Sequence, residues 1–160
     1  KEYWALVSGH LTPSQGICSL AIKESREGRR KRALTSPQPG RGAQHALTLY
    51  KTLSRGALSL ESGRAEVSLV ACRIETGRLH QIRAHMSALG HPVLGDFDYG
   101  GASALNRHTR DVQRDALALH AVRLSFTCPI TGQARSFIAP PSELFKRLAR
   151  EAQLSLKRGP

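Results

Sequence analysis

The chain has 160 residues, with 24 Lys or Arg against 12 Asp or Glu, and therefore carries a formal net charge of +12. Its hydrophobic fraction of 40% and charged fraction of 22% are ordinary for a soluble globular domain, and its length suits one domain with a sizeable core. The charge lies outside the usual range for an enzyme of small neutral metabolites and indicates a polyanionic partner, while the absence of any run of about 18 apolar residues excludes a transmembrane helix.

The N-terminal half has the pattern of strands interrupted by a basic segment. A two-residue alternation over residues 1–8 predicts a strand, and further strands are expected at residues 16–22, 44–51 and 65–74. Residues 23–42 are rich in basic residues, Gly and Pro, which predicts a loop that is mobile unless bound. This loop is either an RNA contact or a solvated charged segment. Its clustered basic residues are Arg29, Arg30, Lys31 and Arg32.

An amphipathic helix is predicted after Thr76, because apolar residues then recur at spacings of three and four. Thr76 is the expected N-cap, and Gly90 is expected to end the helix. On a helical wheel Arg83 starts from the buried side, so its guanidinium should need an anionic partner. The apolar positions are Leu79, Ile82, Met86 and Leu89.

A neighbouring face of this helix carries polar side chains that could meet phosphate. They lie beside the positive end of the helix dipole, where anions are favoured. The alternative is a surface helix with incidental charges. The residues concerned are Arg78, Gln81 and His85.

The C-terminal third predicts a hairpin followed by a helix. Residues 93–101 have the composition of a turn-rich connection, and residues 105–114 that of a loop. Alternation over residues 117–127 and a return strand at 135–139 predict a β-hairpin. Ser142 is expected to cap the last helix. The chain as a whole therefore predicts an α+β domain dominated by sheet.

Arginine dominates the basic residues, with 18 Arg to 6 Lys. The planar guanidinium suits bidentate contact with phosphate, which favours nucleic acid over a membrane surface. The alternative is that the arginine content reflects genomic base composition. Cys18, Cys72 and Cys128 are far apart and odd in number, so we expect buried thiols in a reducing compartment. We expect the cytoplasm, with the mitochondrial matrix as the alternative. Because Met86 is the only methionine, we expect the protein to continue upstream of Lys1.

The segment from Thr76 to His85, TGRLHQIRAH, closely resembles the hallmark of the RNA pseudouridine synthases of the large-subunit rRNA type, the RluA family. Residues 89–96 and the pair Tyr99-Gly100 agree with the same pattern. Residues 1–9, 46–50, 117–121, 126–129 and 137–141 match flanking blocks of the family in order and spacing. The resemblance covers the chain from Lys1 to about Leu148.

This resemblance implies a pseudouridine synthase-like α+β fold: a mainly antiparallel mixed sheet with flanking helices and a cleft across the sheet. Residues 1–160 would form the C-terminal part of a catalytic domain. The family isomerises uridine in RNA with no metal and no organic cofactor, and the seven histidines follow no metal-ligand spacing. The expected partner is RNA, rRNA above all, with ribosomal or assembly proteins as further candidates and no membrane. The oligomeric state stays open.

The resemblance also assigns roles to individual residues. Arg83 would be the cation that pairs with the catalytic aspartate, and Tyr3 would be the aromatic group that packs against the target base. The other polar residues would line the RNA side or brace the helix; these are Arg78, His80, Gln81 and His85.

The family's catalytic aspartate is missing from the matched residues. It sits in an arginine-leucine-aspartate motif upstream of the tyrosine strand, and none of the four aspartates here has that context. We therefore expect this chain alone to be inactive and the parent protein to be an RNA pseudouridine synthase. The alternative is a non-catalytic, RNA-binding relative that acts in ribosome assembly.

Overall fold

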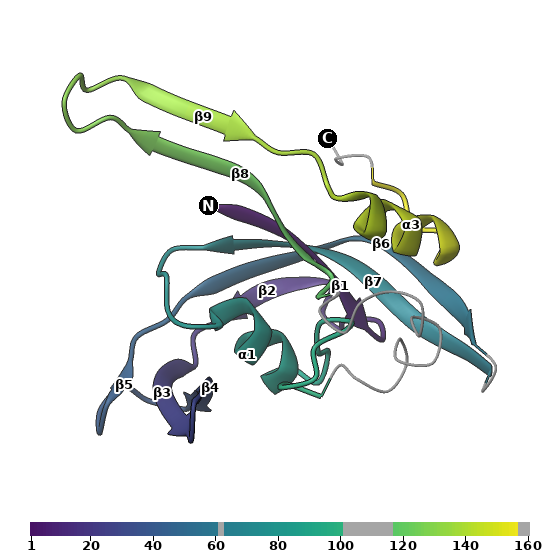
Figure 1. Cartoon of the computed structure of the whole chain (residues 1–160), viewed down its shortest axis with the longest axis horizontal. Helices are drawn as coiled ribbons and strands as arrows, with labels where there is room; N and C mark the ends of the chain where they lie inside the picture. The colour runs from purple at the N-terminus through teal and green to yellow at the C-terminus, as the bar shows by residue number, and fades with distance from the viewer. Residues whose placement is uncertain (61–62, 101–116, 157–160) are drawn as a thin grey trace.

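The computed structural model describes residues 1–60, 63–100 and 117–156, and its main feature is a six-stranded antiparallel sheet. Its strands are β1 (Glu2–Ser8), β2 (Gln15–Cys18), β6 (Thr48–Leu60), β7 (Gly63–Ile74), β8 (Leu119–Thr127) and β9 (Ala134–Ile138). They lie in the order β2-β6-β7-β1-β8-β9, and β8 and β9 extend together beyond the body of the molecule (Figure 1).

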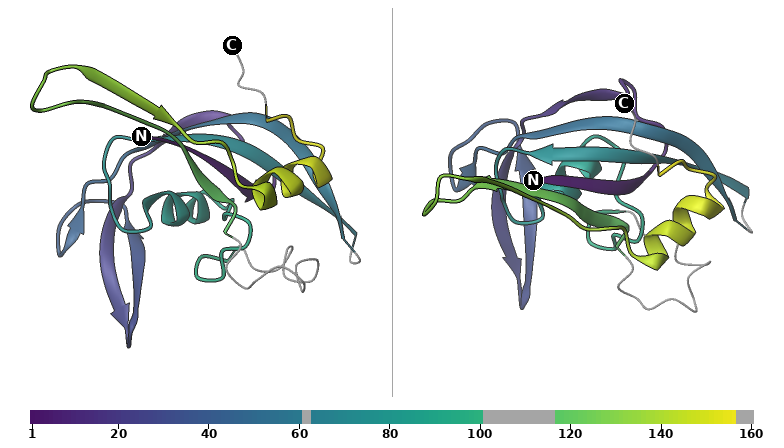
Figure 2. Two further views of the ribbon diagram at one scale, coloured as in Figure 1. Left: turned by 45° about the horizontal axis from the view of Figure 1, so that its top comes forward. Right: turned by 90° about the horizontal axis from the view of Figure 1, so that it is seen from above.

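A second sheet of three strands stands beside the first. It consists of β3 (Ala21–Glu27), β4 (Arg30–Ser36) and β5 (Ala43–Gln44) in the order β4-β3-β5. The β3–β4 hairpin projects away from the main sheet (Figure 2). Helix α1 (Gln81–Ala88) packs against both β4 and β6, while α3 (Glu143–Glu151) packs against β6 near the other end of the main sheet (Figure 1). No helix in the described ranges is long and apolar enough to cross a membrane.

The main core surrounds β1. Four consecutive residues of this strand are buried, so both faces of the sheet are covered there, as the burial of apolar surface requires. Ile82 and Met86 from α1, together with Phe145 and Leu148 from α3, belong to the same core. The buried residues of β1 are Trp4, Ala5, Leu6 and Val7.

Strand β6 makes a close approach to the end of α3. The Ala57 amide donates to the Ala152 carbonyl oxygen over 3.2 Å. A side chain at Gly56 would collide with that oxygen, so only glycine permits this contact.

The predicted α+β fold dominated by sheet is confirmed. The strand over residues 1–8, the hairpin of β8 and β9, and the last helix lie where the patterns placed them. Ser142 caps α3, because its hydroxyl oxygen accepts a hydrogen bond from the Phe145 amide over 3.3 Å. Gly90 has φ of 83° just after α1, as expected of a residue that ends a helix. The expected loop at residues 105–114 lies outside the described residues.

The predicted loop at residues 23–42 is wrong. Residues 21–27 and 30–36 form a paired hairpin, and the expected strand 16–22 divides between β2 and β3. Most side chains of the hairpin are exposed and polar. The sequence therefore shows no hydrophobic alternation there, although the two strands are paired through their backbones. Its base is held by a small separate core of Ile22, Ala33, Ala46, Ala84 and Tyr99.

Two further expectations needed correction. The strand expected at 44–51 is divided: Gln44 belongs to β5, and β6 begins only at Thr48 and continues to Leu60, where residues 53–60 contain Ser and Gly and no β-branched or aromatic residue. Cys18 and Cys72 are buried, and burial raises the pKa of the Cys72 thiol to about 12. Cys128 is instead partly exposed, in the connection between β8 and β9.

Candidate active site

Arg83 of α1 lies at the centre of a charged cluster. Its Nε donates to Asp96 Oδ2 and its Nη2 to Asp96 Oδ1, both over 2.7 Å, and Nη2 also donates to Asp98 Oδ2 over 3.0 Å. The Arg83 side chain is 15% exposed and that of Asp96 is fully buried. The anionic partner predicted for Arg83 therefore exists, and it is supplied by the turn after α1.

This arrangement leaves part of the guanidinium uncommitted. Arginine has five N–H donors, and the contacts with Asp96 and Asp98 use three of them. The remaining two belong to Nη1, which meets no hydrogen-bond acceptor among the described residues. The hydrogen bonds to Asp96 raise the pKa of Arg83 further, so this cation stays charged under all ordinary conditions.

Asp96 also shapes the turn that it occupies. Its Oδ1 accepts from the amides of Asp98 and Tyr99, each over 3.2 Å. A buried aspartate that bonds the amides two and three residues ahead fixes the turn in one conformation. The same carboxylate therefore holds the Arg83 side chain and the backbone that presents Tyr99.

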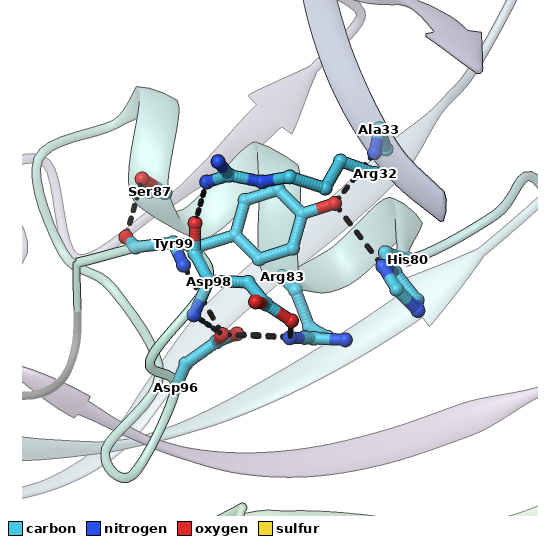
Figure 3. Close-up of polar contacts among 8 residues, drawn as sticks. All are labelled: Arg32, Ala33, His80, Arg83, Ser87, Asp96, Asp98 and Tyr99. Atoms are coloured by element: carbon cyan, nitrogen blue, oxygen red, sulfur yellow. Dashed lines mark hydrogen bonds and ion pairs between the residues drawn. The ribbon is translucent and has the colours of Figure 1, made fainter. Parts of the chain in front are cut away.

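Tyr99 is packed between this turn and the β3–β4 hairpin (Figure 3). The Arg83 Cζ lies 4.8 Å from the centre of its ring, and the Arg32 Cζ lies 5.6 Å from it, both in cation–π geometry. The Tyr99 hydroxyl oxygen accepts from the Ala33 amide over 2.6 Å and lies 3.1 Å from His80 Nδ1. Burial raises the pKa of the Tyr99 phenol, which keeps it neutral.

His80 completes this hydrogen-bond chain. Its pKa is lowered, mainly by burial and then by the nearby Arg83 charge, so the imidazole is neutral near pH 7. Because the Tyr99 oxygen already accepts from Ala33, donation of the Tyr99 hydroxyl proton to His80 Nδ1 gives both of these groups a partner.

Gln81 and His85 do not face RNA, contrary to their predicted placement on the RNA side. The exposed fractions of these two residues are 3% and 0%. His85 Nε2 donates to the Leu20 carbonyl oxygen and Nδ1 accepts from the Thr48 hydroxyl, both over 2.9 Å. Gln81 Nε2 donates to the Thr48 oxygen over 3.0 Å and to the Leu47 carbonyl oxygen over 2.9 Å. These two residues brace α1 against β6, the second of the two roles that the resemblance allowed.

The start of α1 differs from the predicted one. His80 is the N-cap, in a left-handed conformation with φ of 47°, and Thr76 lies one turn earlier. Thr76 instead donates to Gln81 Oε1 over 2.8 Å and accepts from the Leu47 amide over 3.0 Å. Arg78 is exposed ahead of the helix, and its Nε donates to the His45 carbonyl oxygen over 3.0 Å. Arg78 is thus exposed and His80 partly exposed, and their contact with RNA stays a prediction.

Tyr3 lies in the middle of the main sheet. It pairs with Cys72 of β7 and Ala121 of β8 and is partly buried against the main core. Within the described ranges, no hydrogen bond or ring contact joins Tyr3 to the Arg83 cluster. Its predicted stacking on the target base therefore remains a prediction.

The basic residues of the β3–β4 hairpin divide into two groups. Arg29, Arg30 and Lys31 are exposed at its free end. Arg32 turns back toward the cluster, where its Nη2 donates to the Asp98 carbonyl oxygen (Figure 3). Three of the four predicted basic residues are thus exposed and the fourth contacts the Arg83 cluster, while their binding to RNA stays a prediction.

Sequence reasoning missed the role of Tyr99 and the part that Asp96 and Asp98 play beside Arg83. A signal was present, since Gly, two Asp and a Tyr-Gly pair within six residues are typical of a fixed turn. Nothing in that signal tells where the turn lies. Over the described residues, no group of three or more His, Cys, Asp or Glu is placed to hold a metal ion.

Comparison with known proteins gives one family. Residues 1–88 match the family described as RNA pseudouridylate synthase. The chain is 39% identical over 142 residues to a protein from Pasteurella multocida called dual-specificity RNA pseudouridine synthase RluA, covering 89% of this chain and 57% of that protein. It is 37% identical over 154 residues to ribosomal large subunit pseudouridine synthase D of Zymomonas mobilis, covering 92% and 44%. The chain thus spans about half the length of these relatives.

Solved structures agree with the sequence matches. The human RNA pseudouridylate synthase domain containing 1 superimposes with a TM-score of 0.67 at 34% identity, over 88% of this chain and 54% of that one. The human domain containing 4 superimposes with a TM-score of 0.70 over 99% of this chain and 64% of that one. At 22% identity, the second match supports the fold assignment alone.

Proposed function

The chain belongs to the RNA pseudouridylate synthase family, in its RluA-type branch, and from this premise we propose that the protein containing it converts uridine to pseudouridine in rRNA or another structured RNA. The observation that carries the proposal is Arg83. It is a nearly buried cation, aimed by Asp96, that still has an unused nitrogen. A surface helix with incidental charges does not need such a group.

The reaction explains what this cation would do. The C1′–N1 bond of uridine breaks, the uracil turns, and C5 rejoins C1′, which asks for an ionised carboxylate beside the sugar. The Nη1 of Arg83 would hold that carboxylate ionised and oriented, since a nearby guanidinium favours the charged form. Tyr3 would pack against the target base once it has left its stack.

Asp96 is a poor candidate for that carboxylate. Both of its oxygens are bound by Arg83, and the residue is 1% exposed. Asp98 is partly exposed but also paired with Arg83. Asp111 and Asp115 lack the sequence context of the family's catalytic aspartate. We therefore propose that an aspartate outside residues 1–160 supplies the carboxylate and that this chain alone is inactive.

Affinity for RNA would come from exposed basic side chains. Arg29, Arg30 and Lys31 at the end of the hairpin, with Arg78 ahead of α1, are the proposed phosphate contacts. On single-stranded RNA each phosphate contact adds about 0.7 to the slope of log affinity against log salt. Replacing the three hairpin residues with alanine should make the slope shallower by up to about 2. An unchanged slope would mean that the end of the hairpin is a solvated charged segment that does not contact RNA.

The direct test is tritium release from C5-labelled uridine RNA by the full-length protein. Arg83→Lys keeps the charge but removes the fork that binds two acceptors at once, so single-turnover rate should fall by about two orders of magnitude while the RNA dissociation constant changes little. Arg147→Ala, on the exposed face of α3, is the matched control and should leave both values unchanged. A normal rate in Arg83→Lys would remove Arg83 from the mechanism.

The rival proposal is a non-catalytic RNA-binding factor in ribosome assembly. It is favoured by the pairing of both described aspartates with Arg83, because the cluster is electrostatically satisfied without a further carboxylate. Absence of turnover by full-length protein that still binds RNA would establish this rival. In either case we propose a reducing compartment, the cytoplasm or alternatively the mitochondrial matrix, because all three cysteines are free thiols.

A further inference from the structure

The outer edge of the β3–β4 hairpin is attached to the turn of residues 96–99 by two side chains, Tyr99 and Arg32. Strand β4 is the terminal strand of its sheet, so alternate amides along its outer edge have no strand partner. One of these amides, that of Ala33, donates to the Tyr99 hydroxyl oxygen over 2.6 Å. Arg32, the neighbouring residue, lies over the same ring and donates to the Asp98 carbonyl oxygen (Figure 3).

The other side of Tyr99 is fixed to the Arg83 cluster. The Tyr99 amide donates to Asp96 Oδ1 over 3.2 Å, and the Ser87 hydroxyl donates to the Tyr99 carbonyl oxygen over 2.8 Å. The Arg83 guanidinium covers the ring from 4.8 Å. Tyr99 therefore touches the hairpin with its hydroxyl and the site with its ring and backbone.

Besides these side chains, the hairpin is held by the pairing of β3 with β5 at two positions and by the packing of α1 against β4. The small core at its base contains Ile22 and three alanines besides Tyr99, so the tyrosine is its largest side chain. A hollow of about 380 Å³ lies between β4, α1 and the turn, bordered by Leu34, Ser87 and Gly100 among others. Because the hairpin is not closely packed at this hollow, the side-chain contacts of Tyr99 and Arg32 contribute to holding it at its angle.

We propose that Tyr99 is a positioning residue: its hydroxyl holds the β3–β4 hairpin so that RNA bound at the free end is presented to Arg83. This inference rests on the proposed function, because it takes the exposed end of the hairpin to be an RNA contact. The β3–β4 hairpin, which would bind RNA, and Arg83, which would serve the reaction, then belong to one rigid unit.

The test uses Tyr99→Phe, which removes the hydroxyl and keeps the ring between the two arginines. We expect the Ala33 amide to exchange its hydrogen faster in this variant, since its acceptor is lost. RNA affinity should fall by about threefold to tenfold, the effect of losing one hydrogen bond. In a background with Arg29, Arg30 and Lys31 changed to alanine, the same substitution should have no further effect on affinity, because the hairpin no longer contributes.

A matched control is Tyr50→Phe, which removes the same atom from a buried tyrosine of the main sheet and should leave RNA affinity unchanged. A merely structural role for Tyr99 predicts lower melting temperature with normal affinity, or equal losses in both backgrounds, and either result overturns the inference. If the unaltered chain binds no RNA, the proposed function fails and the inference fails with it. If the unaltered chain binds RNA and Tyr99→Phe binds it equally well, only the inference about Tyr99 fails and the proposed function stands.

Discussion

The protein has two projecting hairpins, and they are attached to the body in different ways (Figures 1 and 2). The β8–β9 hairpin continues the main sheet, because β8 pairs with β1 through a backbone ladder. The β3–β4 hairpin belongs to a separate small sheet, in which β3 pairs with β5, and the side chains of Tyr99 and Arg32 connect it to the turn after α1. Side-chain substitutions should therefore displace the β3–β4 hairpin more readily than the β8–β9 hairpin.

The chemistry of the two hairpins also differs. The free end of β3–β4 carries clustered basic residues, while residues 119–138 contain only two Arg, no Lys and no Asp or Glu, and expose several large apolar side chains. Phe126 and Phe137 stack on that hairpin with ring centres 6.1 Å apart. The exposed apolar residues of the hairpin are Leu124, Phe126, Ile130, Phe137 and Ile138. The proposed phosphate contacts therefore lie on the β3–β4 hairpin, which contacts the Arg83 cluster through Tyr99 and Arg32.

The largest expected effect comes from removing Asp96. Asp96→Ala strips the buried Arg83 of its main partner and frees the turn, so the free energy of unfolding should fall by about 3–5 kcal/mol. Asp98→Ala, at a partly exposed carboxylate, should cost only about 1 kcal/mol. Urea unfolding measures both. Equal losses would mean that Asp96 does not hold the cluster together.

A smaller effect should appear as a dependence of stability on pH. Burial lowers the pKa of His85, so below about pH 6.5 the unfolded chain binds a proton that the folded chain does not, and stability falls as the pH falls. Between about pH 7.5 and 5.5 we expect a loss of up to about 1 kcal/mol from this residue. In the His85→Gln variant this side chain cannot titrate, so the free energy of unfolding should fall by up to about 1 kcal/mol less than in the unaltered chain over the same pH range. Identical pH profiles by chemical denaturation would show that His85 is not held neutral.

The smallest effect is expected on the β8–β9 hairpin. Phe137→Ala removes one ring of an exposed pair, so unfolding free energy should change by only about 0.5–1 kcal/mol. Since the backbone ladder to β1 stays intact, amide exchange in β8 should be unaltered next to β1. Loss of protection along the whole strand would show that side chains, not the ladder, hold this hairpin.

The same difference decides how far each hairpin could be predicted from sequence. Alternation and a Pro-containing turn identified β8 and β9, whereas β3 and β4 carry charged residues on both faces and have no such pattern. The need of Arg83 for an anion was also predictable from its place among apolar residues. Its partner was not, because Asp96 lies in a turn whose position depends on the tertiary fold.

Burial of polar residues was the hardest feature to predict. Gln81 and His85 looked suited to RNA because the helical wheel shows only which residues share a face. That face meets Thr48 of β6, whose hydroxyl lets a glutamine and a histidine be buried with their hydrogen bonds satisfied. A contact between elements 33 or more residues apart leaves no trace in local spacing.

Hydrogen–deuterium exchange with and without a structured RNA compares the two hairpins most directly. We predict that RNA protects the β3–β4 hairpin and residues 78–80 while exchange in β8 and β9 stays the same, with the protection lost at high salt. Tyr99→Phe should reduce the protection of β4. Protection confined to the β8–β9 hairpin would contradict the account, because RNA would then bind a hairpin that the Arg83 cluster does not contact.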